Sequence, residues 1–135
     1  GNSLGRMIFR FDNDFAIYLH DTPNRQTFGS SQRAVSHGCV RVENPLELAV
    51  FLLDDKDPVL IDKIRMAIDL PPVTDEGKEF AKKEGLKHIG LKTFKPEIPL
   101  FITYYTAYPD EDGSIVYTSD PYEYDEKIYK LLDSY

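Results

Sequence analysis

Near the start of the chain, apolar and polar positions alternate in the way that is typical of β-strands. Residues 6–11 and 15–20 form two such runs, and the Asp-Asn-Asp turn signal between them predicts a β-hairpin. In the second run every other side chain from Phe15 onward is apolar, as expected of a face turned to a core. The opposite face carries Ala16, Tyr18 and His20, and its polar end is what we expect of a surface that faces a site.

Helical spacing follows in the middle of the chain. Asn44 suits an N-cap, Pro45 suits the first turn, and Glu47 is placed as in a capping box, so a helix is predicted from Pro45 until residues 54–58 end it. Further helices are predicted over residues 59–70 and over residues 74–84, the latter capped by Thr74. The pattern over residues 85–97 is ambiguous.

The last part of the chain mixes strand and helix signals. Residues 98–107 are β-branched and aromatic and predict a strand, residues 110–113 a turn, and residues 114–118 a return strand. Asp120 and Pro121 mark the start of a helix that leads to the end of the chain. The whole pattern is that of an α+β protein.

Composition narrows the class of protein. A chain of 135 residues with 41% hydrophobic residues suits one globular domain. The net charge of −7 argues against a general nucleic-acid binder, and no apolar run is long enough for a membrane span. Because Cys39 is the only cysteine, a disulfide framework and a multi-cysteine zinc knuckle are excluded.

Charge is distributed unevenly along the chain. Residues 22–42 are mostly a long polar loop and contain Arg25, Arg33 and Arg41 but no acidic residue. A cationic cleft on an acidic protein favours a small anionic ligand, and arginine suits the capture of a carboxylate. The alternative for Arg25 and Arg33 is that they are solvated loop residues.

Cys39 is the candidate nucleophile. A lone cysteine is more often a small buried hydrophobic residue, but Gly38 allows a close backbone approach, and His37 and Arg41 place positive charge beside the thiol. His37 is two steps away along one strand, about 6.5–7 Å, whereas a residue across a strand pair is about 4.5–5.5 Å away. We therefore expect His20 to be the general base and His37 to support it, rather than either being a surface or structural histidine.

A zinc site is a further alternative. His20, His37 and Cys39 are three potential ligands, as a catalytic zinc with an open position requires. Their spacing is not a zinc signature, so nucleophilic catalysis fits these residues better.

At these residues the chain resembles the L,D-transpeptidase catalytic domain (the YkuD family). The signature is His20, fifteen intervening residues, and then Ser36-His37-Gly38-Cys39 with Arg41 two positions on. Residues 4–6, 18–23, 33–36, 42–45, 102–107, 112–113 and 121–125 are similar to the large periplasmic YcbB-like subgroup. The resemblance is strong over residues 4–54 and 97–125 and poor over 59–95.

The resemblance implies a mainly-β sheet or sandwich with peripheral helices. Residues 1–135 then form the C-terminal part of the catalytic domain, with a sheet that is incomplete at its N-terminal side. Residues 59–95 are expected to be an insertion or a lid.

The resemblance also implies a mechanism without metal or cofactor. The Cys39 thiolate attacks a peptidoglycan stem tetrapeptide, His20 takes the thiol proton, and the Asp21 carbonyl orients His20. Backbone N–H groups of Gly38 and Cys39 form the oxyanion hole. Ser36 and His37 support the site, and Arg41, Tyr18 and Arg33 bind substrate.

The expected product is a 3→3 crosslink between donor and acceptor stems, or a hydrolysed stem where water replaces the acceptor. Carbapenem-type inhibitors are expected to acylate Cys39, and the location implied is the periplasm of a diderm bacterium. The alternative is a non-catalytic peptidoglycan-binding module that retains the motif.

Overall fold

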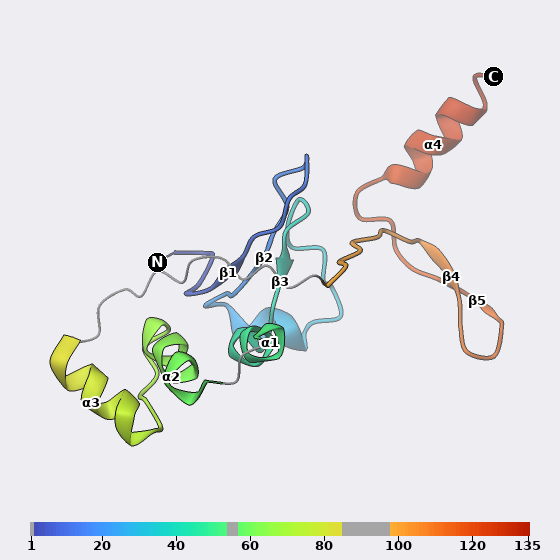
Figure 1. Cartoon of the computed structure of the whole chain (residues 1–135). Coiled ribbons are helices and arrows are strands. Elements are labelled where there is room, and N and C mark those ends of the chain that lie inside the picture. The colour runs from blue at the N-terminus through green and yellow to red at the C-terminus, as the bar shows by residue number, and fades with distance from the viewer. Residues whose placement is uncertain (1, 54–56, 85–97) are drawn as a thin grey trace. The chain divides into compact units, whose positions relative to one another are not determined.

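The structure is a computed structural model, and it describes residues 2–53, 57–84 and 98–135. The chain divides into two compact units, Gly1–Glu97 and Ile98–Tyr135, which are described separately below. Figure 1 shows the order of the elements along the chain, and the predicted α+β class is confirmed. The mainly-β sandwich and the incomplete sheet stay predictions, and the ambiguous residues 85–97 lie outside the described residues.

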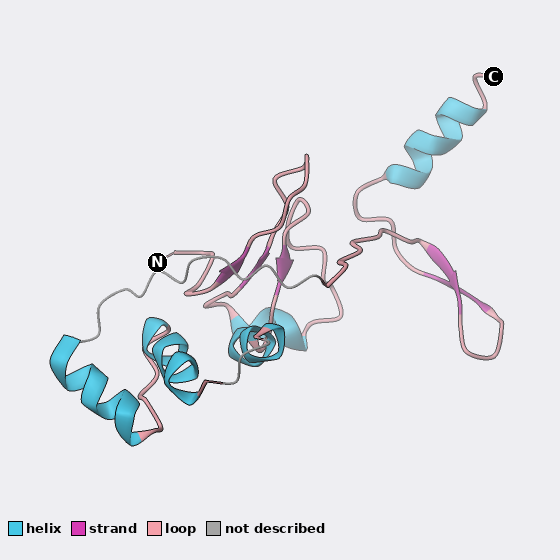
Figure 2. Ribbon diagram, viewed as in Figure 1, coloured by secondary structure: helices cyan, strands magenta, loops and turns pink. Residues whose placement is uncertain are grey.

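A small sheet organises the first unit. Its three strands are β1 (Ile8–Phe9), β2 (Leu19–His20) and β3 (Val40–Arg41), in the order β1-β2-β3 (Figure 2). β1 and β2 pair antiparallel, so the predicted hairpin is confirmed, and β3 joins β2 in parallel. Both hairpin strands are shorter than the predicted runs.

The side chain of Asn13 explains the shortening. Its Oδ1 accepts hydrogen bonds from the backbone N–H groups of Phe15 (3.1 Å) and Ile17 (3.0 Å), and its Nδ2 donates to the carbonyls of Phe11 and Ile17. These bonds occupy backbone groups that a strand ladder would use. Ala16 has a left-handed φ of 53°, and Phe15 is 80% exposed, so the expectation that Phe15 faces the core is wrong.

Three α-helices and a short 3-10 helix complete the first unit as it is described: η1 (Arg25–Gly29), α1 (Pro45–Leu52), α2 (Pro58–Ala67) and α3 (Asp75–Glu84). α1 begins at the predicted residue, although the Asn44 side chain makes no capping hydrogen bond. α2 ends at Ala67, three residues before the predicted end, and α3 is capped as predicted, since the Thr74 hydroxyl accepts from the Gly77 N–H at 3.0 Å.

The core of this unit lies between the hairpin and the first two α-helices. Ala49 and Leu53 from α1 and its C-cap pack against Ile64 of α2, which is fully buried. Apolar side chains from β1, α1 and α2 pack around them: Met7, Phe9, Leu46, Leu60 and Ile61. Burial of one such aliphatic side chain stabilises the fold by about 1.5–3 kcal/mol, and this cluster therefore ties β1 to the helices.

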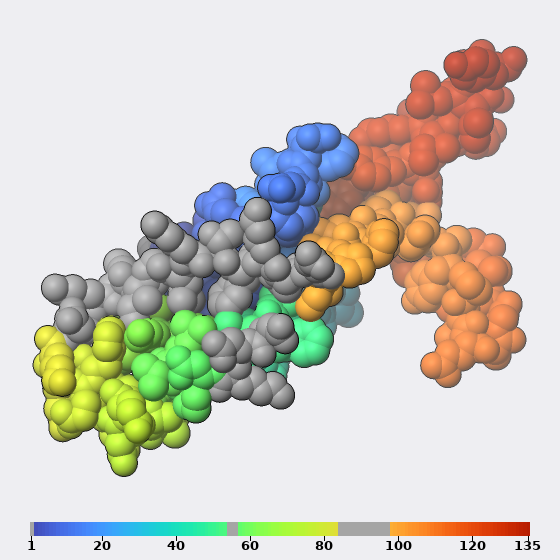
Figure 3. All heavy atoms as spheres, in the orientation of Figure 1, coloured from blue at the N-terminus to red at the C-terminus, as the bar shows by residue number. Residues whose placement is uncertain are grey.

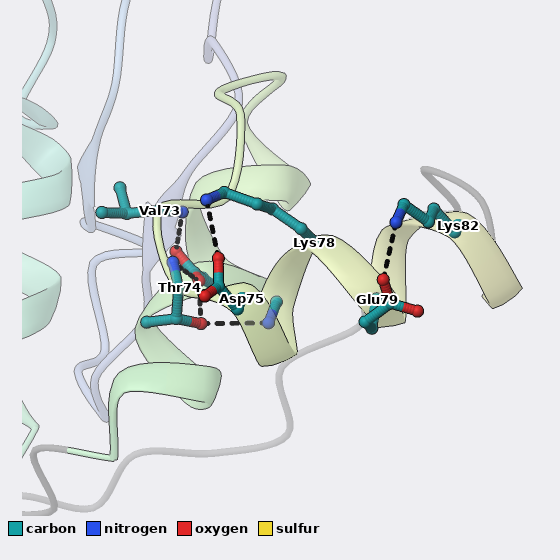
Figure 4. Close-up of polar contacts among 8 residues, drawn as sticks. Val73, Thr74, Asp75, Lys78, Glu79 and Lys82 are labelled. Carbon is teal, nitrogen blue, oxygen red and sulfur yellow. Dashed lines mark hydrogen bonds and ion pairs between the residues drawn. The ribbon is translucent and has the colours of Figure 1, made fainter.

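A buried carboxylate joins α2 to the start of α3. Asp62 is 1% exposed, and its two oxygens accept hydrogen bonds from the backbone N–H groups of Val73 (2.7 Å) and Thr74 (2.8 Å) and from the Thr74 hydroxyl (2.6 Å). Figure 4 shows this cluster, together with the Asp75–Lys78 and Glu79–Lys82 ion pairs along α3. α2 and α3 therefore form one helical hairpin within the segment predicted to be an insertion or lid.

The second unit is a hairpin followed by a helix. β4 (Ala107–Pro109) and β5 (Ile115–Tyr117) pair antiparallel around the predicted turn, and α4 (Tyr124–Leu132) follows. Hairpin and helix extend in different directions within this unit (Figure 3). The predicted strand over 98–107 is wrong for residues 98–106, because the short return strand pairs only with residues 107–109.

Tyrosine rings hold the second unit together. Tyr104 lies 5.4 Å from Tyr122 and 5.2 Å from Tyr124, measured between ring centroids, and its hydroxyl donates to Asp120 at 2.5 Å. Asp120 also accepts from the Asp125 N–H at 2.7 Å, but α4 begins at Tyr124 and not at the predicted Asp120 and Pro121. Partial desolvation and the bond to Asp120 raise the pKa of Tyr104 to about 12.

No helix within the described ranges is long and apolar enough to cross a membrane.

Candidate active site

The three-stranded sheet gathers the candidate site residues on one face. His20 of β2 is in register with Arg41 of β3, and residues in register on neighbouring strands point to the same side. Alternation along the strands puts Tyr18 and Cys39, each two positions away, on that side as well. The Val40 N–H donates to the Tyr18 carbonyl at 3.1 Å, which fixes Cys39 directly before β3 and beside Tyr18.

The pairing of the two strands is the arrangement expected from the sequence. Extending the register of these strands by one pair puts Tyr18 opposite Cys39, and His20, two residues after Tyr18, is diagonal to Cys39. Diagonal neighbours on one face of a sheet are about 7–8 Å apart between Cα atoms, within reach of an imidazole and a thiol.

The imidazole of His20 has a defined orientation. The side chain is buried, at 4% exposure, and Nδ1 lies 2.5 Å from the backbone carbonyl of Asp21. Because a carbonyl oxygen only accepts, Nδ1 carries the proton and Nε2 has a free lone pair. The Tyr18 ring meets the imidazole edge-on, with centroids 6.0 Å apart and an interplanar angle of 64°. A base in this tautomer can accept a proton at Nε2.

Asp21 is itself held on several sides. Its N–H donates to the Met7 carbonyl at 2.8 Å, its Oδ2 accepts from the Arg6 N–H at 3.0 Å, and its Oδ1 lies 3.2 Å from Arg25 Nη2. Gly5, with φ at +63°, lies so close that a Cβ there would be 2.4 Å from Oδ2. These contacts fix the carbonyl that orients His20. Nothing in the pattern of residues indicated that the Asp21 carboxylate has this structural role.

The thiol of Cys39 is half-buried and free. The Ser36 hydroxyl donates to the Cys39 carbonyl at 2.6 Å and accepts from the Gly38 N–H at 3.2 Å, so Ser36 shapes the turn before β3. Gly38 has a φ of +153°, and a Cβ there would be 3.0 Å from the Ile17 Cδ1. Glycine is required in this turn because other residues rarely adopt such a φ.

The remaining predicted residues differ in their placement. Arg41 is partly buried, and its Nε has no hydrogen-bond partner among the described residues. Arg33 is exposed and folds back on its own loop, donating to the carbonyls of Ser30 (2.5 Å) and Phe28 (2.6 Å). His37 is exposed beside the Cys39 turn. Of the arginines in the 22–42 stretch, only Arg41 lies in a strand of the site.

The described residues contain no cluster of side chains that could bind a metal ion. Across residues 2–53, 57–84 and 98–135, no three His, Cys, Asp or Glu side chains come together as a metal site requires. The zinc alternative built on His20, His37 and Cys39 therefore has no support from the geometry.

Arg10 is a site-face residue that the sequence reasoning missed. Its guanidinium carbon lies 5.5 Å from the centroid of the Tyr18 ring. The predicted hairpin could have indicated this position. Arg10 is two residues after Ile8, which pairs with His20, and therefore points to the same face.

Comparison with known proteins finds a family whose model matches this part of the sequence. Residues 2–61 match the model of the YkuD family, described as the L,D-transpeptidase catalytic domain. The chain is also 34% identical, over 134 residues, to a Haemophilus influenzae protein whose curated name is "Putative L,D-transpeptidase". That alignment covers 94% of this chain and 22% of the relative, so the chain spans about a fifth of the relative's length.

The matched segment contains every residue predicted for the site, from Tyr18 to Arg41. The face that carries His20 and Cys39 thus lies in a segment, residues 2–61, that matches the YkuD family of L,D-transpeptidase catalytic domains.

Proposed function

We propose that this chain is the cysteine acyltransferase part of a peptidoglycan L,D-transpeptidase that forms 3→3 crosslinks. The observation that carries the proposal is the parallel pairing of β2 with β3, which sets His20 and Cys39 on one face while the Asp21 carbonyl leaves His20 Nε2 free. Family membership supports the reaction class.

In the proposed acylation, the Cys39 thiol proton passes to His20 Nε2. The thiolate then attacks the carbonyl carbon between the diamino acid and the terminal D-Ala of the donor tetrapeptide. The C–N bond breaks, His20 returns the proton to the leaving amine, and D-Ala departs, leaving a thioester on Cys39.

In the second half of the proposed reaction, the side-chain amine of an acceptor stem attacks the thioester carbonyl. Its proton goes to His20, the C–S bond breaks, and the proton returns to the Cys39 sulfur. Water in place of the amine gives a carboxypeptidase reaction with the same balance of protons.

The surrounding residues have proposed roles in this scheme. The Cys39 N–H is the first oxyanion donor, and the Gly38 N–H joins it when the Ser36 hydroxyl releases its present bond. Arg41 binds the donor's carboxylate, with an Nε that has no partner in the described structure. Tyr18 lines the site, and His37 and Arg33 flank its entrance.

The wider setting is also part of the proposal. Peptidoglycan stems as donor and acceptor, acylation of Cys39 by carbapenems, and a periplasmic location all follow from the family. The relative's far greater length fits the large YcbB-like subgroup. A larger β-sheet and a lid formed by residues 59–95 are also proposed. Within that lid segment, the structure describes α2 and α3.

The test is incubation of the chain with a purified disaccharide-tetrapeptide, followed by mass analysis. We expect D-Ala release, a thioester adduct on Cys39 and a crosslinked dimer, and a carbapenem adduct in a parallel sample. Cys39→Ala abolishes every adduct, and His20→Gln slows acylation by at least about a hundredfold, the usual contribution of a general base.

A second outcome has a defined meaning. If the tetrapeptide binds with equal affinity to the unchanged chain and to Cys39→Ala, and no D-Ala is released, the chain is a peptidoglycan-binding module. The acyltransferase proposal is then wrong.

A further inference from the structure

Arg10 lies on the same face of the sheet as the proposed catalytic pair. The antiparallel register Ile8↔His20 and Phe9↔Leu19 continues with Arg10 opposite Tyr18. The guanidinium of Arg10 over the Tyr18 ring, 5.5 Å from its centroid, agrees with that placement. Two arginines therefore share this face, Arg10 next to β1 and Arg41 in β3.

The two arginines lie on either side of the strand that carries His20. Neighbouring strands are about 4.8 Å apart, so residues of β1 and β3 are separated by about 10 Å across β2. An extended peptide that crosses the strands at Cys39 spans this distance with about three residues. A single peptide ligand can therefore reach both guanidinium groups.

Arg10 and Arg41 also differ from the arginines that have acidic partners. Arg6 pairs with Asp69, Arg25 with Asp21, and Arg65 with Asp62. Among the described residues, neither Arg10 nor Arg41 has a carboxylate within ion-pair distance, although the protein carries a net charge of −7.

A guanidinium that lies over an aromatic ring can still use its N–H groups to bind a ligand. When the plane of an arginine lies over an aromatic ring, its N–H groups point outward in a fork that matches a carboxylate. Arg10 is exposed, so its guanidinium is accessible to a ligand beside the site. The Tyr18 ring thus contacts both the Arg10 guanidinium and the His20 imidazole.

We propose that Arg10 is a substrate-binding residue that captures a carboxylate of the stem peptide, at a position across β2 from Arg41. The inference rests on the proposed function for the identity of the peptide. The carboxylate is either the one at the C-terminus of the tetrapeptide or one further along the stem, and Arg10 recognises both by the same chemistry.

The test measures binding without turnover. In a Cys39→Ala background, the dissociation constant is determined by calorimetry for three probes: the free tetrapeptide, its C-terminal amide, and a form whose internal carboxylates are amidated. Arg10→Gln removes the charge, Arg10→Lys keeps the charge without the fork, and circular dichroism melts verify that each variant is folded.

We expect Arg10→Gln to weaken binding of the free tetrapeptide about tenfold, as loss of a charge-assisted hydrogen bond does. Arg10→Lys recovers part of that loss. The probe that lacks the recognised carboxylate binds Arg10→Gln and the arginine form equally, and this identifies which carboxylate Arg10 contacts. Lys63→Gln is the matched control. Lys63 of α2 also lies over an aromatic ring, since its Nζ is 4.9 Å from the ring centroid of Phe80 in α3.

The inference is wrong if Arg10→Gln binds the free tetrapeptide with unchanged affinity. It is also wrong if Arg10→Gln loses affinity equally for all three probes, or if no probe binds the chain at all. Failure of the proposed function is distinguishable, since it appears as absence of D-Ala release by the unchanged chain while carboxylate-dependent binding persists.

Discussion

Gly38, directly before the proposed nucleophile Cys39, has a backbone conformation that no other residue type adopts easily. Its φ of +153° turns the chain directly before Cys39, and the Ser36 hydroxyl bridges the turn from both sides. The position of the thiol therefore depends on a residue without a side chain.

Gly38→Ala is expected to slow acylation of Cys39 by at least about tenfold, since a φ strain of about 1–3 kcal/mol is relieved only by moving the turn. The added Cβ also lies 3.0 Å from the Ile17 Cδ1. The acylation rate is followed by mass analysis with a carbapenem. Gly29→Ala is the control, because nothing lies within 4 Å of a Cβ there. Equal rates for the two variants contradict this prediction.

Asp21 combines two tasks, since its carbonyl orients His20 while its carboxylate binds the chain before β1. Asp21→Ala leaves the Arg6 N–H without its acceptor and the Arg25 guanidinium without its ion pair. We expect a loss of about 1–3 kcal/mol in the free energy of unfolding, measured with urea, and slower acylation because the His20 ring is less well held. Asp14→Ala, an exposed position in the hairpin turn, serves as the comparison. If both variants are equally stable, the carboxylate has no such role.

At this scale the sequence predicted which segments pair better than it predicted the contacts of single side chains. The residue types of His20 and Cys39 and the loop between them were enough to predict neighbouring strands, and β2 and β3 do pair. The parallel register could not be predicted, because it depends on how the whole loop is folded. Arg33 shows the same limit, since its bonds to Ser30 and Phe28 follow from the local course of the chain.

At the scale of elements, the α2–α3 hairpin depends on the ionised state of one carboxyl group. Burial of Asp62 opposes ionisation, but the Thr74 hydroxyl, the Val73 and Thr74 N–H groups and Arg65 outweigh it and hold the pKa of Asp62 below its usual range. A carboxyl whose pKa is lower in the folded state contributes stability above its unfolded pKa of about 3.9, and that stability is lost as the pH falls through the folded value.

We therefore expect the α2–α3 hairpin to lose stability below about pH 4, as measured by amide exchange and by melting temperature between pH 7 and pH 2.5. Asp62→Asn costs about 1–3 kcal/mol at neutral pH, because its amide cannot accept all three bonds, and it flattens the acid dependence. Asp75→Asn is the control, since the Asp75 side chain is 92% exposed. If Asp62→Asn still loses stability steeply at acid pH, the acid dependence is due to titratable groups other than Asp62.

The starts of α1 and α3 were predicted more accurately than the strand lengths, for a physical reason. Pro45 and Thr74 act through the first turn of their own helices, so the local sequence is sufficient. A strand needs a partner, and residues 98–106 have strand-like composition without a strand to pair with in the described structure. Asn13 likewise ended a strand-like run through side-chain bonds that apolar alternation does not reveal.

At the scale of the whole molecule, the two units differ in how much they bury. The first has a core around Ile64, whereas no side chain of residues 98–135 is buried. Segments below about 40 residues rarely fold alone without a metal, a disulfide or a partner. The second unit relies on the contacts among its tyrosine rings and on the Tyr104–Asp120 hydrogen bond for its order.

We expect this difference in hydrogen exchange of the 135-residue chain. Amides of β5 (Ile115–Tyr117) exchange at least about a hundredfold faster than those around Ile64, since exchange protection follows local stability and burial. Tyr104→Phe removes the bond to Asp120 and speeds exchange in α4 further, while exchange around Ile64 stays unchanged. If the amides of β5 are as protected as those of α2, the prediction is wrong. Such protection requires a cooperative core, and the residues of the second unit do not form one by themselves.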